Sequence, residues 1–224
     1  MPSFPVLDVK AAVTGDNDAR AAQVRAELDA SRTFLVNLMA SPGAGKTSTL
    51  AATIPLLAGQ FRIGVIEADV DSAVDAETLE ALGVRVVQLH TGGSCHMDAG
   101  MTRKGLEQLS LEELDLVFLE NVGNLVCPAE FDVGAQLKAM ILSVPEGDDK
   151  PLKYPLMFQV SDVMLVNKID AAPVFDFSLE ACEGRVRELN PSIEVLPISA
   201  KTGEGVEAWA AWLAARVEAW RESL

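Results

Sequence analysis

The sequence is poor in cysteine, and its first residues lack a secretory signal. Only three cysteines, Cys95, Cys127 and Cys182, occur in 224 residues, an odd and sparse set that argues against a disulfide framework. The opening segment MPSFPVLDVK has no positive charge followed by an apolar stretch. We therefore expect a protein of the reducing cytoplasm.

Long apolar runs and an excess of positive charge are also missing. No stretch reaches the roughly 18 uninterrupted apolar residues of a membrane-spanning helix. The 18 Lys and Arg face 33 Asp and Glu, which gives a formal net charge of −15. Such a surface repels nucleic-acid phosphates and anionic membranes, so we expect neither as a general partner. It is compatible with a metal cation or a basic protein surface, and equally with solubility alone.

Apolar runs alternate with helical patterns along most of the chain. The apolar runs that predict buried strands are 33–39, 62–67, 84–90, 115–120, 139–144, 162–167 and 193–198. The helical patterns cover 46–58, 74–82, 97–109, 176–189 and 205–222, the last with Trp209, Trp212, Leu213 and Val217 on one face. The alternation predicts a three-layer α/β fold, with a mostly parallel twisted sheet of about seven strands covered by helices on both faces. Ligands of such sheets bind beyond the carboxyl ends of the strands.

A shorter N-terminal region precedes this alternation. We expect loose order over residues 1–16 and an amphipathic helix over 17–31 that lies outside the main domain. The sequence therefore predicts an N-terminal extension and helix over 1–31 and one P-loop domain over 32–224.

The segment ASPGAGKT, which begins at Ala40, follows an apolar strand and leads into a helix. It nearly matches the phosphate-binding P-loop pattern, with Ala40 in place of the first glycine. Gly43 and Gly45 leave room for backbone N–H groups to surround phosphate oxygens. Lys46 can reach the β- and γ-phosphates, and the Thr47 hydroxyl can coordinate Mg²⁺. The predicted phosphate-binding residues are Gly43, Ala44, Gly45, Lys46, Thr47 and Ser48. A ligand-free glycine-rich turn is the alternative.

Acidic residues follow two further predicted strands. Glu120 is the first choice for the acid that holds Mg²⁺, directly or through water, and Asp69 is a second metal-side carboxylate. Asp75 is expected to orient the attacking water. Gly123 can donate its backbone N–H to the γ-phosphate, so that its segment senses hydrolysis. Alternatively, Asp71 and Asp75 are ordinary residues of a helix N-terminus.

The segment NKID, residues 167–170, has the NKxD pattern of GTP-binding proteins. Its aspartate can accept hydrogen bonds from guanine N1–H and the 2-amino group, which adenine does not offer in that arrangement. The segment SAK, residues 199–201, follows the last predicted strand at the next base-side loop. The predicted base-binding residues are Asn167, Lys168, Asp170, Ser199, Ala200 and Lys201. A polar helix cap is the alternative for NKID alone.

Two cysteines and a histidine suggest a metal site. Cys95 and His96 are adjacent, and Cys127 lies four residues after Gly123. Thiolate and imidazole suit Ni²⁺, Zn²⁺ or Cu. Three ligands are few for a closed tetrahedral site, and a two-fold dimer could complete the shell. Alternatively, both cysteines are small buried apolar residues, as we expect for Cys182.

Four sequence segments that follow the P-loop resemble those of the hydrogenase nickel-incorporation GTPases. They are TGGSCH, ENVGNLVCPAEFD, EGDDKPLKYP and NKID. The resemblance covers the chain from about residue 33 to its last helix. It implies a P-loop GTPase of the signal-recognition-particle/MinD/BioD class that dimerises with GTP and delivers nickel to the large subunit of [NiFe]-hydrogenase. The resemblance also implies a nickel-delivery accessory protein as a partner. It also implies a metal site of Cys95, His96 and Cys127 near the dimer interface, and a contact of Lys153 with nucleotide across the dimer. An ordinary surface lysine is the alternative for Lys153.

The sequence leaves several alternative functions open. The chain has no cysteine-rich N-terminal motif and no histidine-rich tract, so we do not expect storage of several nickel ions. A related urease-accessory GTPase, a non-catalytic metal sensor or storage protein, and an ATP-dependent small-molecule kinase are the alternative functions. The cysteine–histidine layout disfavours the first, and Asp170 disfavours the last. The sequence does not choose between nickel and zinc.

Overall fold

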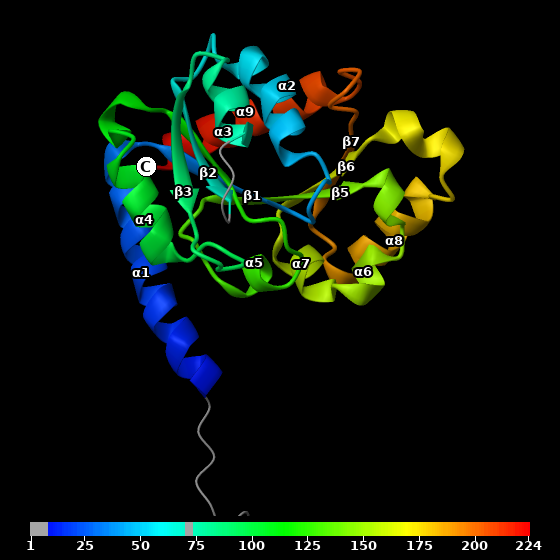
Figure 1. The fold of residues 1–224 in the computed structure, drawn as a ribbon, viewed down its shortest axis with the longest axis horizontal. Helices are drawn as coiled ribbons and strands as arrows, with labels where there is room; N and C mark the ends of the chain where they lie inside the picture. Colours follow the sequence, from blue (N-terminus) through cyan, green and yellow to red (C-terminus); the bar gives the residue numbers. More distant parts are fainter. Residues whose placement is uncertain (1–8, 70–73) are drawn as a thin grey trace, which may run out of the picture.

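The computed structural model describes the backbone of residues 9–69 and 74–224, and the side chains from residue 15 onward within those ranges. Across this described part, seven strands form one sheet in the order β3-β2-β4-β1-β5-β6-β7 (Figure 1). The strands are β1 Phe34–Ala40, β2 Ile63–Asp69, β3 Arg85–His90, β4 Leu116–Glu120, β5 Leu137–Ser143, β6 Val163–Asn167 and β7 Glu194–Pro197. Every neighbouring pair is parallel. The predicted α/β class and strand number are confirmed.

Helices cover both faces of the sheet (Figure 1). They are α1 Val9–Ser31, α2 Lys46–Leu57, α3 Val74–Glu80, α4 Ala99–Glu107, α5 Cys127–Glu130, α6 Lys150–Lys153, α7 Pro155–Val160, α8 Leu179–Leu189 and α9 Val206–Ser223. Short 3₁₀ turns are η1 Leu111–Glu113, η2 Val144–Glu146 and η3 Ile169–Val174. None of the helices within the described ranges combines the length and hydrophobicity needed to cross a membrane.

The core follows from the apolar runs. Every residue of β1 and β4 is buried, because helices pack on both faces of these central strands. One cluster joins the sheet to α2 and α9, a second joins it to α1 and α4, and a third joins it to α7 and α8. The predicted apolar face of α9 is confirmed, since Trp209, Leu213 and Val217 are buried and Trp212 packs beside them.

The first helix differs from the prediction in length. It begins at Val9 rather than at residue 17, so the expected loose order is wrong for residues 9–16. Residues 1–8 lie outside the described part of the chain.

The first helix also differs in its contacts. We expected it outside the main domain, but Ala21, Val24 and Leu28 are fully buried against the sheet and α4. Their spacing of three and four residues places them on one helix face, which explains why they share this core. The boundary between residues 31 and 32 stays a prediction.

Candidate functional site

The phosphate-loop segment connects the end of β1 to α2. Gly43 and Gly45 have φ values of 74° and 101°, in the left-handed region that disfavours other residues. A Cβ atom at Gly45 would also lie 2.5 Å from Nδ2 of Asn167. Ala40 is the buried last residue of β1, and it needs no such conformation. The missing first glycine therefore does not disturb the loop.

Asn167 and Lys168 bind the phosphate loop to the base-side loops. The amide Nδ2 of Asn167 donates to the Ala44 carbonyl at 2.9 Å, while its Oδ1 accepts from the Ala200 N–H at 3.1 Å. The ammonium of Lys168 donates to the Gly43 carbonyl at 2.6 Å. The predicted NKID and SAK segments are thus brought together around the glycine-rich turn.

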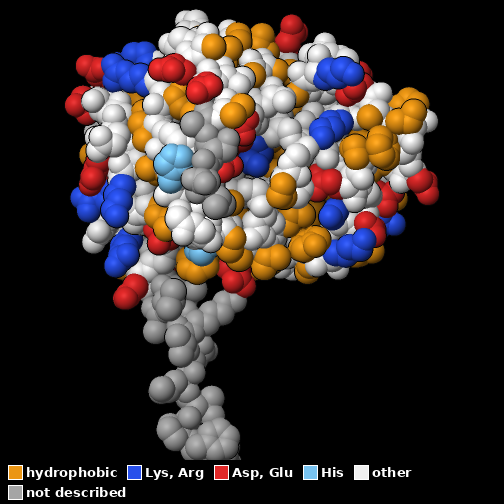
Figure 2. Space-filling model, viewed as in Figure 1, with side chains coloured by type: hydrophobic (Ala, Val, Ile, Leu, Met, Phe, Trp, Pro, Cys, Tyr) orange, Lys and Arg blue, Asp and Glu red, His pale blue; other side chains and the backbone are white. Residues whose placement is uncertain are grey.

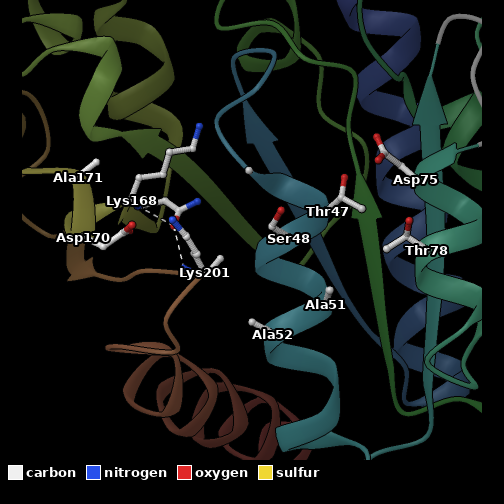
Figure 3. Close-up of a pocket in the computed structure, with 13 residues that line it drawn as sticks. Thr47, Ser48, Ala51, Ala52, Asp75, Thr78, Lys168, Asp170, Ala171 and Lys201 are labelled. Carbon is white, nitrogen blue, oxygen red and sulfur yellow. Dashed lines mark hydrogen bonds between the residues drawn. The ribbon is translucent and has the colours of Figure 1, made fainter.

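Asp170 lies in the same group, held by a buried serine. The Ser199 hydroxyl is fully buried and donates to Oδ1 of Asp170 at 2.7 Å, and it accepts from the Thr202 N–H at 3.2 Å. This fixes the direction of the Asp170 carboxylate. Figure 3 shows Asp170 and Lys201 on one side of the start of α2, and Asp75 on the other.

A cleft of about 800 Å³ lies between these side chains. Its lining is formed by Gly45, Thr47, Ser48, Ala51, Ala52, Asp75, Thr78, Asn167, Lys168, Asp170, Ala171, Ala200 and Lys201. It opens beyond the carboxyl ends of the strands, where parallel sheets bind ligands. Lys153, by contrast, lies on α6 away from this lining and forms an ion pair with Asp149.

Three carboxylates converge beside the phosphate loop. Glu67 on β2 and Glu120 on β4 are register partners, and each is only 2% exposed. Oxygens of these two residues and of Asp75, in α3, lie within 4.8 Å of one another. The Thr47 hydroxyl donates to Oε1 of Glu120 at 2.8 Å. The Oε2 atoms of Glu67 and Glu120 are buried without a hydrogen-bond partner.

Burial and mutual repulsion weaken the acidity of these carboxyls. Burial raises the pKa of Glu67 to about 8, and the neighbouring charge of Glu120 adds to the effect. Burial raises the pKa of Glu120 to about 7, although the charge of Lys46 and the Thr47 hydrogen bond oppose it. A cation placed among these oxygens would relieve both effects.

The sequence also predicted acids at Asp69 and Asp71 beside this site. Asp69 is the half-buried last residue of β2, and its charge further raises the pKa of Glu67 and Glu120. Asp71 lies outside the described residues. Sequence reasoning missed Glu67, because it read that residue as the end of a buried strand. An acid inside an apolar run was the available signal.

The segment after β4 lies directly against the phosphate loop. The Asn124 N–H donates to the Ala40 carbonyl at 2.8 Å, and the Asn121 N–H donates to the Leu38 carbonyl at 3.0 Å. A Cβ atom at Gly123 would lie 3.0 Å from the Pro42 backbone. Only glycine allows this approach without displacing the loop.

The structure also brings the predicted soft ligands together. Cys95, His96 and Cys127 offer ligand atoms within 4.8 Å of one another. The two sulfur atoms are 3.0 Å apart, and the Cys95 sulfur lies 3.8 Å from Nδ1 of His96. The His96 ring stacks on Phe131 with centroids 4.0 Å apart. Cys182 is buried in the third core cluster, as predicted.

The protonation of this group favours metal binding at His96. Burial lowers the pKa of His96, which keeps the imidazole neutral and able to act as a ligand. The hydrogen bond with Cys95 raises the pKa of the Cys127 thiol. Two adjacent thiolates repel each other, and a bound cation removes that repulsion.

Two asparagines join the soft-ligand group to the segment after β4. Oδ1 of Asn121 accepts from the Met97 N–H at 3.1 Å, one residue beyond His96. Nδ2 of Asn124 donates to the Cys95 carbonyl at 3.4 Å. The same segment therefore contacts both the phosphate loop and the cysteine–histidine loop.

Known proteins share this sequence and architecture. The family described as CobW/HypB/UreG, nucleotide-binding domain, matches residues 34–197. The hydrogenase maturation factor HypB of Azotobacter vinelandii is 48% identical over 225 residues, which cover 97% of this chain and 74% of that protein. A crystal structure of HypB from Helicobacter pylori in complex with nickel is similar with a TM-score of 0.86 at 35% identity, covering 91% of this chain and 95% of that chain.

A more distant likeness concerns the fold alone. The signal recognition particle receptor FtsY from Elizabethkingia anophelis has a TM-score of 0.55 at 14% identity, covering 84% of this chain and 70% of that chain. The arrangement of sheet and helices is therefore also that of this signal recognition particle receptor.

Proposed function

Because the chain belongs to the CobW/HypB/UreG family, and within it to the HypB hydrogenase maturation factors, we propose that it is a GTPase that binds nickel and serves hydrogenase maturation. One observation carries the proposal. The segment 120–127 begins at the buried acid Glu120 beside the phosphate loop and ends at Cys127 in the soft-ligand group. A change at the nucleotide can therefore reach a metal ligand along the eight residues of this one chain segment.

The nucleotide binds in the cleft beside α2. Backbone N–H groups of the glycine-rich turn and the N-terminus of α2 face the phosphates, and Lys46 adds a positive charge. Asp170 selects guanine, since its carboxylate is held in place by Ser199 and accepts two N–H donors of that base. Lys168 and Lys201 pack their aliphatic stems against the base.

The converging carboxylates of Glu67, Asp75 and Glu120 suit a hard divalent cation. Two buried carboxylate oxygens without partners are the donors that Mg²⁺ prefers. We assign Thr47, Asp69 and Glu120 to the magnesium side of the nucleotide, joined by Glu67. Bound Mg²⁺ neutralises negative charge that develops on the phosphate oxygens.

Hydrolysis needs an oriented water molecule. Its coupling to the metal site also needs a group that responds to the loss of the γ-phosphate. Asp75 lines the cleft near Thr47 and orients the water by accepting its hydrogen bond. Gly123 gives its N–H to the γ-phosphate. When that phosphate leaves, the segment after β4 is released from the phosphate loop, and Asn124 and Cys127 move with it.

Nickel is the cargo of the soft-ligand group. Two thiolates and a neutral imidazole suit Ni²⁺, and they also accept Zn²⁺. Three ligands from one chain leave the shell incomplete, so we infer that a second copy supplies the rest.

Exposed apolar side chains beside this group support a dimer. Val126 is 49% exposed next to Cys127, and Leu152 and Leu156 are exposed on α6 and α7. Figure 2 shows hydrophobic side chains gathered on this lower part of the visible face. Lys153 lies among them, and we propose that it contacts the nucleotide of the partner.

Turnover and nickel binding together test the proposal. Wild-type protein is expected to hydrolyse GTP in preference to ATP, and Lys46→Ala is expected to abolish hydrolysis. Cys95→Ala and Cys127→Ala are expected to weaken nickel binding in isothermal titration while GTP binding stays largely intact. Nickel binding without any GTP hydrolysis would favour the non-catalytic sensor instead.

A further inference from the structure

The helix α1 contacts both segments that carry the soft ligands. Asn17 of α1 contacts both segments, and only 7% of this residue is exposed. Its Oδ1 accepts from the Ala99 N–H at 3.0 Å, and its Nδ2 donates to the Asp132 carbonyl at 2.8 Å. Ala99 follows His96 by three residues, and Asp132 follows Cys127 by five. One buried side chain therefore joins the two parts of the metal site.

Further contacts hold the second of these segments against α1. Nη1 of Arg25 is 2.8 Å from Oδ2 of Asp132, whose Oδ1 accepts from the Gly134 N–H at 2.9 Å. Gly134 has a φ of 83°, and a Cβ atom there would lie 2.7 Å from Val24. The loop at Gly134 therefore packs closely against Val24 of the helix, with no room for a side chain between them.

The path from Asn17 to the ligands is short. Phe131 precedes Asp132 and stacks on the His96 ring. Met97 follows His96, is fully buried, and lies in the same apolar cluster as α1. In Figure 1, α1 lies along α4, which begins at Ala99. A shift of α1 would consequently change the distance between the His96 ring and the α5 thiol.

We propose that α1 is a positioning element of the metal site, with Asn17 as the residue that fixes the cysteine–histidine loop relative to α5. This inference rests on the proposed nickel site. It gives the N-terminal helix a specific role, because anything that displaces α1 lowers nickel affinity without touching a ligand. Residues outside the ligand shell that orient ligands typically change metal affinity about 10- to 100-fold when replaced.

The test compares Asn17→Ala with a matched substitution far from both sites. Asn190 caps the end of α8, before β7 and at the end of the sheet opposite both sites, and its Nδ2 donates to the carbonyls of Phe158, Gln159 and Ser161. Asn190→Ala therefore makes the same substitution and also removes side-chain hydrogen bonds to backbone carbonyls, at α8 rather than at α1. Nickel affinity, guanine-nucleotide affinity and the thiolate-to-nickel absorption band are measured for full-length wild type and both variants.

We expect Asn17→Ala to bind nickel about 10-fold or more weakly, with a changed absorption band and a GDP affinity within about twofold of wild type. Asn190→Ala is expected to lower thermal stability while leaving the nickel affinity and the band unchanged. Equal nickel affinity and an unchanged band in Asn17→Ala would overturn the inference and leave the nickel site intact. A wild type without any thiolate-to-nickel band would instead overturn the proposed function.

A second variant separates the two hydrogen bonds of Asn17. Asn17→Asp keeps an acceptor for the Ala99 N–H but loses the donor to the Asp132 carbonyl. A buried carboxylate oxygen then faces the Asp132 carbonyl, so Asn17→Asp is expected to weaken nickel binding at least as much as Asn17→Ala does. Arg25→Ala, which removes the ion pair with Asp132, serves as the test if Asn17→Ala fails to fold, and it is also expected to weaken nickel binding. Nickel affinity equal to wild type in a folded Asn17→Asp protein would show that the Asp132 contact does not position the site, which contradicts the inference.

Discussion

Glu67 and Glu120 lie opposite each other on β2 and β4, and each has a buried carboxylate oxygen without a hydrogen-bond partner. Two such groups repel each other unless a proton or a cation lies between them. Because they lie beside Thr47, a cation between them would belong to the proposed nucleotide site. Binding of such a cation would relieve the repulsion between the two carboxylates.

The first prediction concerns Glu67→Gln. The substitution keeps the shape of the side chain and removes one buried charge, so Mg²⁺ is expected to bind the nucleotide complex about 10-fold more weakly. Without metal, the variant is expected to unfold at a higher temperature than wild type, because the repulsion is gone. Titration with Mn²⁺ followed by electron paramagnetic resonance measures the first effect, and calorimetry in chelator measures the second. Unchanged metal affinity would remove Glu67 from the site.

The second prediction concerns guanine selection. Ser199→Ala leaves the Asp170 carboxylate in place but removes the hydroxyl that orients it. GTP affinity is expected to fall about fivefold, the value of one hydrogen bond. Asp170→Ala is expected to lose much more, with little preference left between GTP and ATP. Competition binding with the two nucleotides measures both variants; a retained guanine preference in Asp170→Ala would contradict the assignment.

The third prediction concerns Gly123→Ala. The added methyl group would lie 3.0 Å from the Pro42 backbone, so the segment after β4 and the phosphate loop must separate. Affinity for a non-hydrolysable GTP analogue is expected to fall about tenfold, while GDP affinity changes little. Gly184→Ala is the control, because a Cβ atom there meets nothing within 4 Å. Equal losses for both nucleotides would argue against a γ-phosphate contact.

The fourth prediction concerns acid stability at the opposite end of the sheet. Asp115 accepts hydrogen bonds from the backbone and guanidinium of Arg62 and from Arg221, which hold its pKa well below the usual range. A depressed pKa stabilises the fold above the unfolded value of about 4. That stability is lost as the pH falls below this value toward the folded pKa.

Asp115→Asn is therefore expected to lower the free energy of unfolding at pH 7 by about 1 to 2 kcal/mol, reduced from the full value because Arg62 stays exposed to water. The difference from wild type should shrink as the pH falls from 4 to 2. Urea unfolding over this pH range measures it, with GTP affinity at pH 7 as the control for the distant site. A difference that is constant with pH would exclude the ion pair as its source.

Much of the fold follows from the sequence because the central strands are buried on both faces. Such strands appear in the sequence as continuous apolar runs. All seven strands begin within two residues of the predicted start. The short helices α5, α6 and α7 were not predicted, since Pro128, Pro151 and Pro155 interrupt their helical pattern. The start of α1 was missed because Gly15 and Thr14 weaken the helical signal there.

The candidate site could be predicted where a motif has a fixed backbone, and not where it depends on packing. The glycine-rich turn, the NKID segment and the Cys95–His96 pair follow from residue order. Glu67 is marked in the sequence only as an acid inside an apolar run, and Asn17 has no such signal. Their roles depend on which strand lies beside β2 and on where α1 packs, and both are tertiary facts.

We propose that the nucleotide controls a thiolate–imidazole nickel site through the segment after β4. The most direct measurement is the nickel dissociation constant of the wild type with a non-hydrolysable GTP analogue and with GDP, at one pH and with excess Mg²⁺. The two constants are expected to differ about tenfold or more, a coupling of about 1.4 kcal/mol, and Cys127→Ala is expected to abolish the difference. Equal nickel affinity in the two nucleotide states of the wild type would contradict the account.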